Sequence, residues 1–371
     1  MKYYLVTGEP SGERHARALA AALRRADPAA ELRISLSEDG AVMGLKAPFR
    51  QAGAILRRLG RCQAEIDSWR PDAVIPVDYP TFNLRIARHA RRRGCRVCWY
   101  IAPKTWASRE GRIRPLRRDV DRLLVIFPFE EEYFRQRGVN ALYVGNPLLD
   151  APVPAETREA FLQRCGLPEG KYIALLPGSR RAELETMLPP LAAVADALHG
   201  EGWHFLAAGA PGREEREYAG LLTGRETFVH LLFNETAAIL RHAEAAVVNS
   251  GTASLEAALA GTPQLVGYRT DALTWALGKR LVKVPWISLP NLLLGREAVK
   301  ELLQVELTAD AIVRELRALT ADEALRERMR GDCAALHALL GGPGAADNAA
   351  RAILASLSSS ENEITGAKFE R

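Results

Sequence analysis

Short apolar runs alternate with longer segments of helical spacing through the first 150 residues of the chain. The runs predict strands that each end at a turn signal, at 3–8, 72–80, 96–103, 122–129 and 141–147. Segments such as 12–26 and 83–93 lie between them and carry apolar residues at the intervals of a helix that packs on one face. Because the strands are apolar throughout rather than at alternate positions, they predict a parallel sheet with helices on both faces.

The same pattern restarts after residues 150–171, a segment with Pro, Gly and charged residues and one helical stretch. Strands are predicted again, at 172–179, 204–212, 228–233, 245–251 and 263–269. A chain of 371 residues also exceeds what a single hydrophobic core usually supports. We therefore predict an α/β protein of two doubly wound, Rossmann-like domains that face a cleft, with ligands at the carboxyl ends of the strands.

The domain boundaries follow from this pattern and from the polar C-terminal end. We predict an N-terminal domain, a C-terminal domain, one C-terminal helix and a disordered tail, at 1–155, 156–340, 341–357 and 358–371. No apolar run approaches the roughly 18 to 20 residues that span a bilayer, and the N-terminus has no apolar signal core. These observations predict a cytoplasmic protein of ordinary globular composition.

Charge is divided unevenly between the two halves. Residues 1–150 hold 27 Lys and Arg and 17 Asp and Glu, a net charge of +10, and the remainder holds 23 and 28, a net charge of −5. The basic half predicts an anionic partner, such as phosphate groups, anionic lipid or nucleic acid, although a solvated helix face gives the same pattern. The cysteines are scattered, and a predicted strand explains Cys95 and Cys98 better than a metal or redox pair does. We predict no metal and no cofactor.

The stretch "VVNSGTASLEAALA" places Ser250, Gly251 and Thr252 between a buried strand and a helix. The first amides of a helix have no partner within it and carry partial positive charge, so they bind anions. Gly251 allows a ligand to approach the backbone, the two hydroxyls add polar contacts, and Glu256, one turn further, could reach a ribose hydroxyl. The alternative is a helix cap without a ligand.

A second strand, turn and helix follow from "YIALLPGSRRAELETMLPPL", with Gly178 and Ser179 in the turn and Arg180 at the junction. A guanidinium beside unpaired amides can bind two oxygens of one phosphate, although a surface arginine near a helix start is the alternative. Two such sites in one domain fit a diphosphate better than a single phosphate. Neither loop has the GxxxxGKS/T or GxGxxG pattern, which argues against an ATPase or a simple dehydrogenase.

The N-terminal half has polar strand ends of its own. The stretch "YLVTGEPSGERHARAL" places Glu9, Ser11 and Gly12 where a strand gives way to a helix. Asp78 ends the apolar strand in "VIPVDYP", and a carboxylate is costly to bury there unless it is paired or used. Asp78 is therefore a candidate general base, and a cap for the following helix is the alternative.

An amphipathic basic stretch, 40–61, mixes apolar residues such as Met43 with arginines that include Arg57 and Arg58. Such a stretch can lie on an anionic membrane or hold an acyl chain. Core packing of an ordinary helix explains it equally well, and the sequence leaves both interpretations open.

Taken together, these motifs resemble the lipid-A-disaccharide synthase family, glycosyltransferases of the two-domain GT-B fold. The resemblance covers nearly the whole chain, and many short motifs in the right order are more specific than any one of them. The motifs are, in chain order, "GEPSGE", "VDYPTFN", "PKTW", "FPFE", "VGNPLLD", "LLPGSRRAE", "NSGTASLE", "VGYR", "KRLV" and "WISLPNLLLGREAVKELLQ".

The resemblance implies an inverting, metal-independent transfer of 2,3-diacylglucosamine from its UDP derivative to 2,3-diacylglucosamine 1-phosphate, with a β-1,6 bond formed and UDP released. Asp78 matches the family's candidate base for the acceptor 6-hydroxyl, and Glu9 and Arg180 are further candidate catalytic residues. The donor would be bound by Gly178, Ser179, Arg180, Ser250, Gly251, Thr252, Glu256, Tyr268 and Asn291. The acceptor and membrane side would include Ser11, Gly12, Met43, Arg57 and Arg58.

The resemblance also implies a protein that is peripheral on the inner membrane and binds no nucleic acid. Its C-terminal helix would cross back onto the N-terminal domain or be exchanged within a homodimer. Departures from the family's motifs fall on the acceptor side: Glu13 replaces Asp, Ser108 replaces a second Trp, Asn146 replaces His, and the segment before "AVMG" is shortened.

The donor-side motifs are nearly intact, so the main alternative is another UDP-sugar enzyme of the same fold. That enzyme would be a UDP-N-acetylglucosamine 2-epimerase or a transferase with a different acceptor. A nucleic-acid-binding module is the third hypothesis, but the chain has no helix-turn-helix, zinc finger or aromatic RNP pattern.

Overall fold

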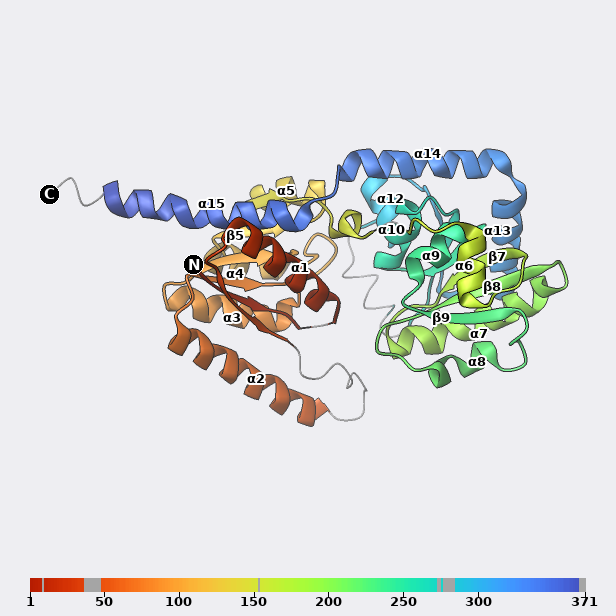
Figure 1. Ribbon diagram of the computed structural model, residues 1–371, viewed down its shortest axis with the longest axis horizontal. Helices are drawn as coiled ribbons and strands as arrows, with labels where there is room; N and C mark the ends of the chain where they lie inside the picture. The colour runs from red at the N-terminus through yellow and green to blue at the C-terminus, as the bar shows by residue number, and fades with distance from the viewer. Residues whose placement is uncertain (9, 37–47, 153, 272–274, 276–283, 367–371) are drawn as a thin grey trace. The chain divides into compact units, whose positions relative to one another are not determined.

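The computed structural model describes residues 1–8, 10–36, 48–152, 154–271, 275 and 284–366, and the chain divides into two compact units (Figure 1). The first unit joins residues 1–151 to the C-terminal segment that begins at Leu340, and the second spans Pro152–Leu339. Each unit is built around one six-stranded sheet whose paired strands are parallel. The fold therefore contains two doubly wound α/β units, as the alternation of apolar runs and helical segments predicts.

The first sheet has the strand order β2-β1-β3-β4-β5-β6. Its strands are buried on both faces, since Tyr4 of β1 packs into one core cluster and the next residue, Leu5, into another. The elements of this unit before its C-terminal helix are β1 (Lys2–Val6), α1 (Pro10–Ala26), β2 (Glu31–Ser35), α2 (Pro48–Trp69), β3 (Ala73–Pro76), α3 (Pro80–Arg92), β4 (Arg96–Tyr100), η1 (Glu110–Arg112), α4 (Ile113–Asp119), β5 (Arg122–Val125), α5 (Pro128–Arg135), β6 (Ala141–Tyr143) and η2 (Pro147–Asp150).

The second sheet has the strand order β12-β11-β10-β7-β8-β9. If β7 is counted as the first strand of this unit, this is the Rossmann order. Tyr172 and Ile173 of β7 again enter two different core clusters, so this sheet is covered on both faces as well. Its elements are α6 (Arg158–Cys165), β7 (Lys171–Leu176), α7 (Arg181–His199), β8 (Trp203–Gly209), η3 (Glu215–Tyr218), α8 (Ala219–Leu222), β9 (Val229–Phe233), α9 (Thr236–His242), β10 (Ala245–Asn249), α10 (Thr252–Leu259), β11 (Gln264–Tyr268), α12 (Leu289–Leu294), β12 (Lys300–Leu303), η4 (Gln304–Glu306), α13 (Ala309–Ala321) and α14 (Glu323–Leu340).

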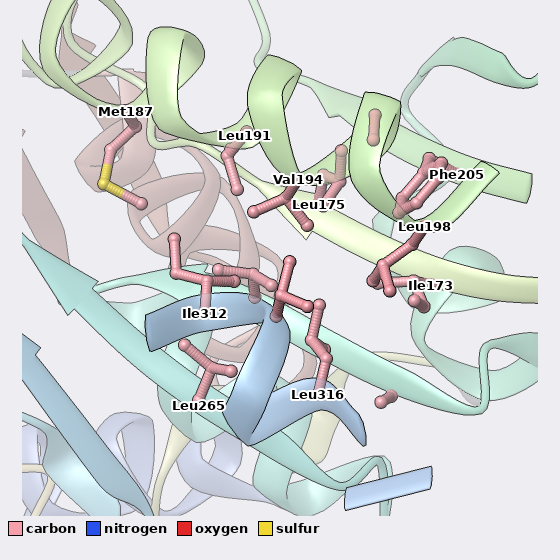
Figure 2. Packing of buried hydrophobic residues seen from close by; sticks show 14 of the residues in the cluster. Ile173, Leu175, Met187, Leu191, Val194, Leu198, Phe205, Leu265, Ile312 and Leu316 are labelled. Atoms are coloured by element: carbon pink, nitrogen blue, oxygen red, sulfur yellow. The ribbon is translucent and has the colours of Figure 1, made fainter. Parts of the chain in front are cut away.

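The larger core of the second unit holds α7 in place over its sheet. Figure 2 shows Leu191 and Val194 of α7 close to Leu175 of β7, with Ile312 and Leu316 of α13 in the same cluster. All five side chains are almost completely buried, and burial of each such side chain contributes about 1.5 to 3 kcal/mol. This packing holds α7 against β7, and so holds the turn between β7 and α7 at the edge of the sheet.

The strands β2 and β12 lack the continuous apolar run that marks the other strands in the sequence. Both lie at an edge of their sheet, and β2 has no fully buried residue. An edge strand has one neighbour instead of two, so it needs no continuous apolar run. For that reason "ELRIS" and "KELL" carry charged residues and give no strand signal in the sequence.

The C-terminal helix α15 (Ala345–Gly366) crosses back onto the first unit of its own chain. Asp150 caps its start, because the Asp150 carboxylate accepts the amides of Gly344, Ala345 and Ala346 at 2.5, 3.1 and 3.2 Å. The side chains that join the core of the first unit are Ala346, Ala349, Ala350, Ile353 and Leu357. The helix runs past residue 357, its predicted end, since no Gly or Pro interrupts 358–365.

Two further findings concern membrane-spanning helices and metal-binding clusters among the described residues. Among the helices they form, none combines the length and apolar character that crossing a bilayer requires. Within the same residues, no three His, Cys, Asp or Glu side chains are grouped so that they could hold a metal ion. All five cysteines are free thiols, with Cys98 inside β4 and Cys95 directly before it. This pair therefore belongs to the packing of the first sheet.

Candidate functional site

Both sheets bring a pair of loops together where the strand order reverses. In the first sheet β1 lies between β2 and β3, and in the second β7 lies between β8 and β10. Loops that leave such neighbouring strands in opposite directions open a crevice at the carboxyl edge of the sheet, and ligands of doubly wound folds bind there. Most of the predicted site residues follow β1 and β3 in the first unit, and β7 and β10 in the second.

In the second unit the loops after β7 and β10 lie against each other at a glycine. Gly178 has a φ of 110°, and a Cβ at this position would fall 2.9 Å from Nδ2 of Asn249, the last residue of β10. The left-handed backbone and the close approach both exclude a side chain. Gly178 therefore lets the two candidate phosphate loops share one edge of the sheet.

The start of α7 already holds an anionic group, the carboxylate of Glu183. Its Oε2 accepts the amides of Ser179 and Arg180 at 2.9 and 3.0 Å, and its Oε1 lies 3.0 Å from Nη1 of Arg180. The sequence predicts that these amides are open to a phosphate, and this is corrected here, because Glu183 occupies them. The guanidinium of Arg180 differs: its side chain is 61% exposed, so a phosphate can reach it although Glu183 pairs with it.

The start of α10 is the open anion site of this unit. In the described part of the chain, no acceptor takes the amides of Gly251, Thr252 or Ala253. Ser250 does not offer its hydroxyl proton as predicted, because Oγ donates that proton to the carbonyl of Ile287 at 3.0 Å. A phosphate at this helix start would meet the three amides and the exposed Thr252, with Ser250 anchoring the loop.

The side chain of Asn291 has no hydrogen-bonding group left for a ligand. Its side chain is completely buried, and Oδ1 accepts the amides of Ala298 and Val299 at 2.8 and 2.9 Å. Its Nδ2 donates to the Val299 carbonyl and to the Glu301 carboxylate, both at 2.9 Å. Because both acceptor positions and both donors are used, the predicted direct contact between Asn291 and the donor is corrected.

The remaining donor-side residues lie at the same edge of the sheet. Glu256 is half-buried one turn into α10, and Tyr268 ends β11 with its ring centroid 6.5 Å from that of Trp275. Arg213, which the sequence analysis missed, donates from Nε to the Ser179 carbonyl at 2.9 Å. The loop after β8 thus fixes the loop after β7, a contact that no local motif indicates.

In the first unit, Asp78 follows β3 with an uncommon backbone conformation. Asp78 and Tyr79 both have a φ of 47°, a region that is unfavourable for residues other than glycine and often occurs at functional sites. Asn83 maintains this conformation, since its Nδ2 donates to the carbonyls of Asp78 and Val77 at 2.7 and 3.2 Å. The helix α3 begins at Pro80 with Tyr79 as its N-cap, so Asp78 is not the cap that the alternative interpretation requires.

The half-buried carboxylate of Asp78 lies within electrostatic reach of Arg112. Burial lowers the pKa of Arg112 and the neighbouring Arg109 lowers it further, whereas the charge on Asp78 raises it. The loop after β1 reaches the same place, because a Cβ on Gly8 would fall 2.0 Å from the ring of Tyr79. The loops after β1 and β3 therefore meet beside Asp78.

The other residues predicted near Asp78 belong to the start of α1. Gly12 is buried, and a Cβ on it would lie 3.8 Å from the Val77 carbonyl. Ser11 is in the first turn of the helix. Glu9 and Met43, the two further predictions on this side, lie outside the described residues.

Arg57 and Arg58 occupy different faces of α2, although the sequence predicts both on the acceptor and membrane side. Arg57 is exposed on the same helix as Ile55 and Leu56, which are 40% and 58% exposed. Arg58 turns inward: its guanidinium donates to the carbonyls of Thr7 and Ser35, the latter at 3.3 Å. Successive helical residues differ by about 100° in direction, so the prediction for Arg58 is corrected.

The motifs "PKTW" and "FPFE" meet at a buried carboxyl group. Nε1 of Trp106 donates to Oε1 of Glu130 at 2.9 Å, and Oε2 accepts the amides of Ile126 and Phe127 at 3.2 and 3.1 Å. Burial raises the pKa of Glu130 to about 7 in spite of these donors. Asn146, which replaces the histidine of the family's motif, is also buried. Its Nδ2 donates to the Ile126 carbonyl at 3.1 Å.

His15 makes the stability of the first unit sensitive to acid. Burial lowers the pKa of His15 from 6.5 to about 4; Arg14 lowers it further, and Asp150 opposes the shift. Between these two values the unfolded chain binds a proton that the fold does not bind. The free energy of unfolding should therefore fall by up to about 3 kcal/mol as the pH drops from 6.5 to 4. Urea unfolding of His15→Gln over this range should show a flatter profile, and an equally steep one would contradict the assignment.

Solved structures with this arrangement define the class of protein. The fold matches that of a putative UDP-N-acetylglucosamine 2-epimerase from Listeria monocytogenes with a TM-score of 0.65 at 16% identity, over 98% of this chain and 97% of that one. It also matches a ugt transferase from Siraitia grosvenorii in complex with UDP, with a TM-score of 0.60 at 10% identity, over 96% and 99%. The protein is a two-domain α/β protein of the GT-B class.

The sequence comparisons identify the family within this class. The profile of the family described as lipid-A-disaccharide synthetase matches residues 3–341. The lipid-A-disaccharide synthase of Myxococcus xanthus is 37% identical over 367 residues, 94% of this chain and 96% of that protein, and that of Acidobacterium capsulatum is 36% identical over 369 residues, 92% of each. The chain belongs to the lipid-A-disaccharide synthase family of glycosyltransferases, so the resemblance of its motifs is confirmed.

Proposed function

We propose that this chain transfers 2,3-diacylglucosamine from UDP-2,3-diacylglucosamine to 2,3-diacylglucosamine 1-phosphate, with inversion, a β-1,6 bond formed and UDP released. The observation that supports this most directly is the open start of α10 at the switch point of the second sheet. Its three amides have no acceptor within the described residues, and Arg180 follows the neighbouring strand. Together they suit the diphosphate of a UDP-sugar.

In the proposed reaction the carboxylate of Asp78 takes the proton of the acceptor 6-hydroxyl, and that oxygen attacks C1 of the donor sugar. The bond between C1 and the UDP oxygen breaks, its electron pair leaves with UDP, and the configuration at C1 inverts. The conformation that Asn83 maintains supports this role, because it holds the carboxylate at the strand end. A catalytic part for Glu9 stays a prediction.

The charge that develops on UDP is met by protein groups in this proposal. The amides of Gly251, Thr252 and Ala253 carry the partial positive charge of the α10 start, and the Arg180 guanidinium adds a full charge. We assign Glu256, on the same helix, to the ribose hydroxyls. Tyr268 is proposed to contact the donor, without assignment to one of its groups.

We assign the acceptor and the membrane contact to the first unit. Ile55 and Leu56 are exposed on α2 together with Arg57, a combination that suits an anionic lipid surface. The excess of 27 basic over 17 acidic residues in 1–150 suits a phosphorylated acceptor as well. The enzyme would then work in the cytoplasm, peripheral on the inner membrane. A homodimer stays a prediction.

Mass spectrometry of the product made from both acylated substrates tests the proposal. A disaccharide monophosphate together with stoichiometric UDP is the expected result. If the folded protein released no UDP from the two substrates but turned over unacylated UDP-N-acetylglucosamine, the alternative UDP-sugar enzyme would be favoured instead.

Arg180→Ala should weaken UDP binding and slow turnover together. The variant loses a charge-assisted contact to the diphosphate, which corresponds to about 10-fold or more in the Kd of UDP by calorimetry. Arg181→Ala is the matched control, because the next arginine is also exposed and pairs with Glu185 at 2.8 Å. Equal affinities of the two variants for UDP would remove Arg180 from the site.

A further inference from the structure

Glu301 lies outside the loops assigned to the donor, on the edge strand β12 of the second sheet. We infer that Glu301 is a positioning residue for the donor site: it holds the segment at the start of α12, and through that segment the loop after β10. The inference rests on the proposed function, because it concerns the loop that would bind the donor diphosphate.

Four hydrogen-bond donors converge on the Glu301 carboxylate. Oε1 accepts the amide and the hydroxyl of Ser288 at 3.0 and 2.6 Å and Nδ2 of Asn291 at 2.9 Å, while Oε2 accepts the amide of Ile287 at 3.1 Å. Ser288 and Asn291 are completely buried. Bonds to a charged acceptor are about twice as strong as neutral ones, so this carboxylate fixes the position of 287–291 firmly.

A single peptide unit connects this carboxylate to the phosphate loop. The N–H of Ser288 donates to Glu301, and the carbonyl of the same peptide unit, that of Ile287, accepts the hydroxyl of Ser250 at 3.0 Å. An anionic acceptor on the N–H side polarises the peptide and strengthens the bond on the carbonyl side. Ser250 is directly followed by Gly251, where the open amides begin, so Glu301 determines where those amides point.

A neutral side chain of the same size cannot replace this carboxylate. Glutamine has one acceptor oxygen and one NH2 group. The NH2 group would face N–H and O–H donors, which cannot accept its hydrogens. In Glu301→Gln the segment 287–291 must therefore shift, and Ser250 shifts with it. Glu301→Asp keeps the charge and both oxygens, so it should keep more of the UDP affinity than Glu301→Gln.

The test is a double-mutant cycle on the full-length protein, with the Kd of UDP from calorimetry and the thermal midpoint as separate readouts. Glu301→Gln should weaken UDP binding about 10-fold and Ser250→Ala about 3-fold, roughly the loss of one charge-assisted or one neutral bond. The double variant should bind like Glu301→Gln alone, since both act along one path. Asp322→Ala is the control, because Asp322 accepts the amide of Leu325 at 3.0 Å near the start of α14 and should affect only the thermal midpoint.

The outcomes separate this inference from the proposed function. Wild-type protein that does not bind UDP overturns the proposed function. If wild-type protein binds UDP and Glu301→Gln binds it equally well with a lower thermal midpoint, Glu301 is only structural and the inference fails. Additive losses in the double variant also overturn it. If Glu301→Gln does not fold, Ser250→Ala decides: an unchanged UDP affinity in that variant refutes the connection, and a loss of about 3-fold supports it.

Discussion

Asp78→Asn should form the disaccharide about 10³-fold more slowly than wild-type protein, with the Kd of UDP unchanged within about twofold. The amide has the shape of the carboxylate but cannot accept the acceptor's proton. The backbone bonds that place the residue remain, because they come from the Asp78 amide to Tyr100 at 3.0 Å and from Asn83 to the Asp78 carbonyl. UDP affinity stays because the loops after β7 and β10 belong to the other unit.

The pH dependence distinguishes a lost base from a disturbed loop. In wild-type protein kcat/KM should fall on the acid side as Asp78 takes up a proton, and the residual activity of Asp78→Asn should lack that limb. Asp72→Asn is the matched control, since Asp72 lies just before the same strand β3 and accepts the amide of Lys2 at 2.7 Å. Full activity in Asp78→Asn, or an acid limb that survives in it, would show that another group is the base.

Burial explains which parts of the fold the sequence predicts. Central strands such as β1 and β7 are covered on both faces, so every residue after the first, which is a lysine in both, is apolar and the run is visible in the sequence. The edge strands β2 and β12 are not covered in this way and carry charged residues, so they have no such run. The crossing of α15 is a long-range contact that no local pattern shows, and only the resemblance to the family implied it as one of two arrangements.

The candidate loops could be located from sequence, whereas most partners of their side chains could not. Glycines and hydroxyl residues between a strand and a helix mark the loops, because the backbone must turn sharply there. The partner of Ser250 lies 37 residues further on, and Asn291 of α12 donates to Glu301 of the following strand β12, so no local pattern shows these partners. Glu183 is the exception: it lies three residues after Arg180, the spacing of a capping box, which indicates that the amides at that helix start are occupied.

Removal of α15 by truncation after Gly342 should unfold the first unit while the second unit still binds UDP. Ile353 and Leu357 each contribute about 1.5 to 3 kcal/mol by burial, and the three buried alanines of α15 and the surface beneath the helix contribute further. The same core cluster includes Tyr3, Leu19 and Leu23, none of which is exposed in the intact chain. The loss is on the order of 10 kcal/mol, comparable with the whole stability of a domain.

Thermal unfolding and calorimetry of the truncated chain measure the two units separately. The transition of the first unit should disappear, and UDP should bind with a Kd near that of the full chain, because the core of the second unit contains no residue of α15. Truncation after Ser358 is the control, since it keeps Leu357, the last residue of the described core, and should leave both transitions in place. Ile353→Ala gives the graded version, with an expected loss of about 2 to 5 kcal/mol. A first unit that stays folded without α15 would mean that the helix covers its sheet without stabilising it, and transfer activity that persisted in that chain would make α15 dispensable for the reaction as well.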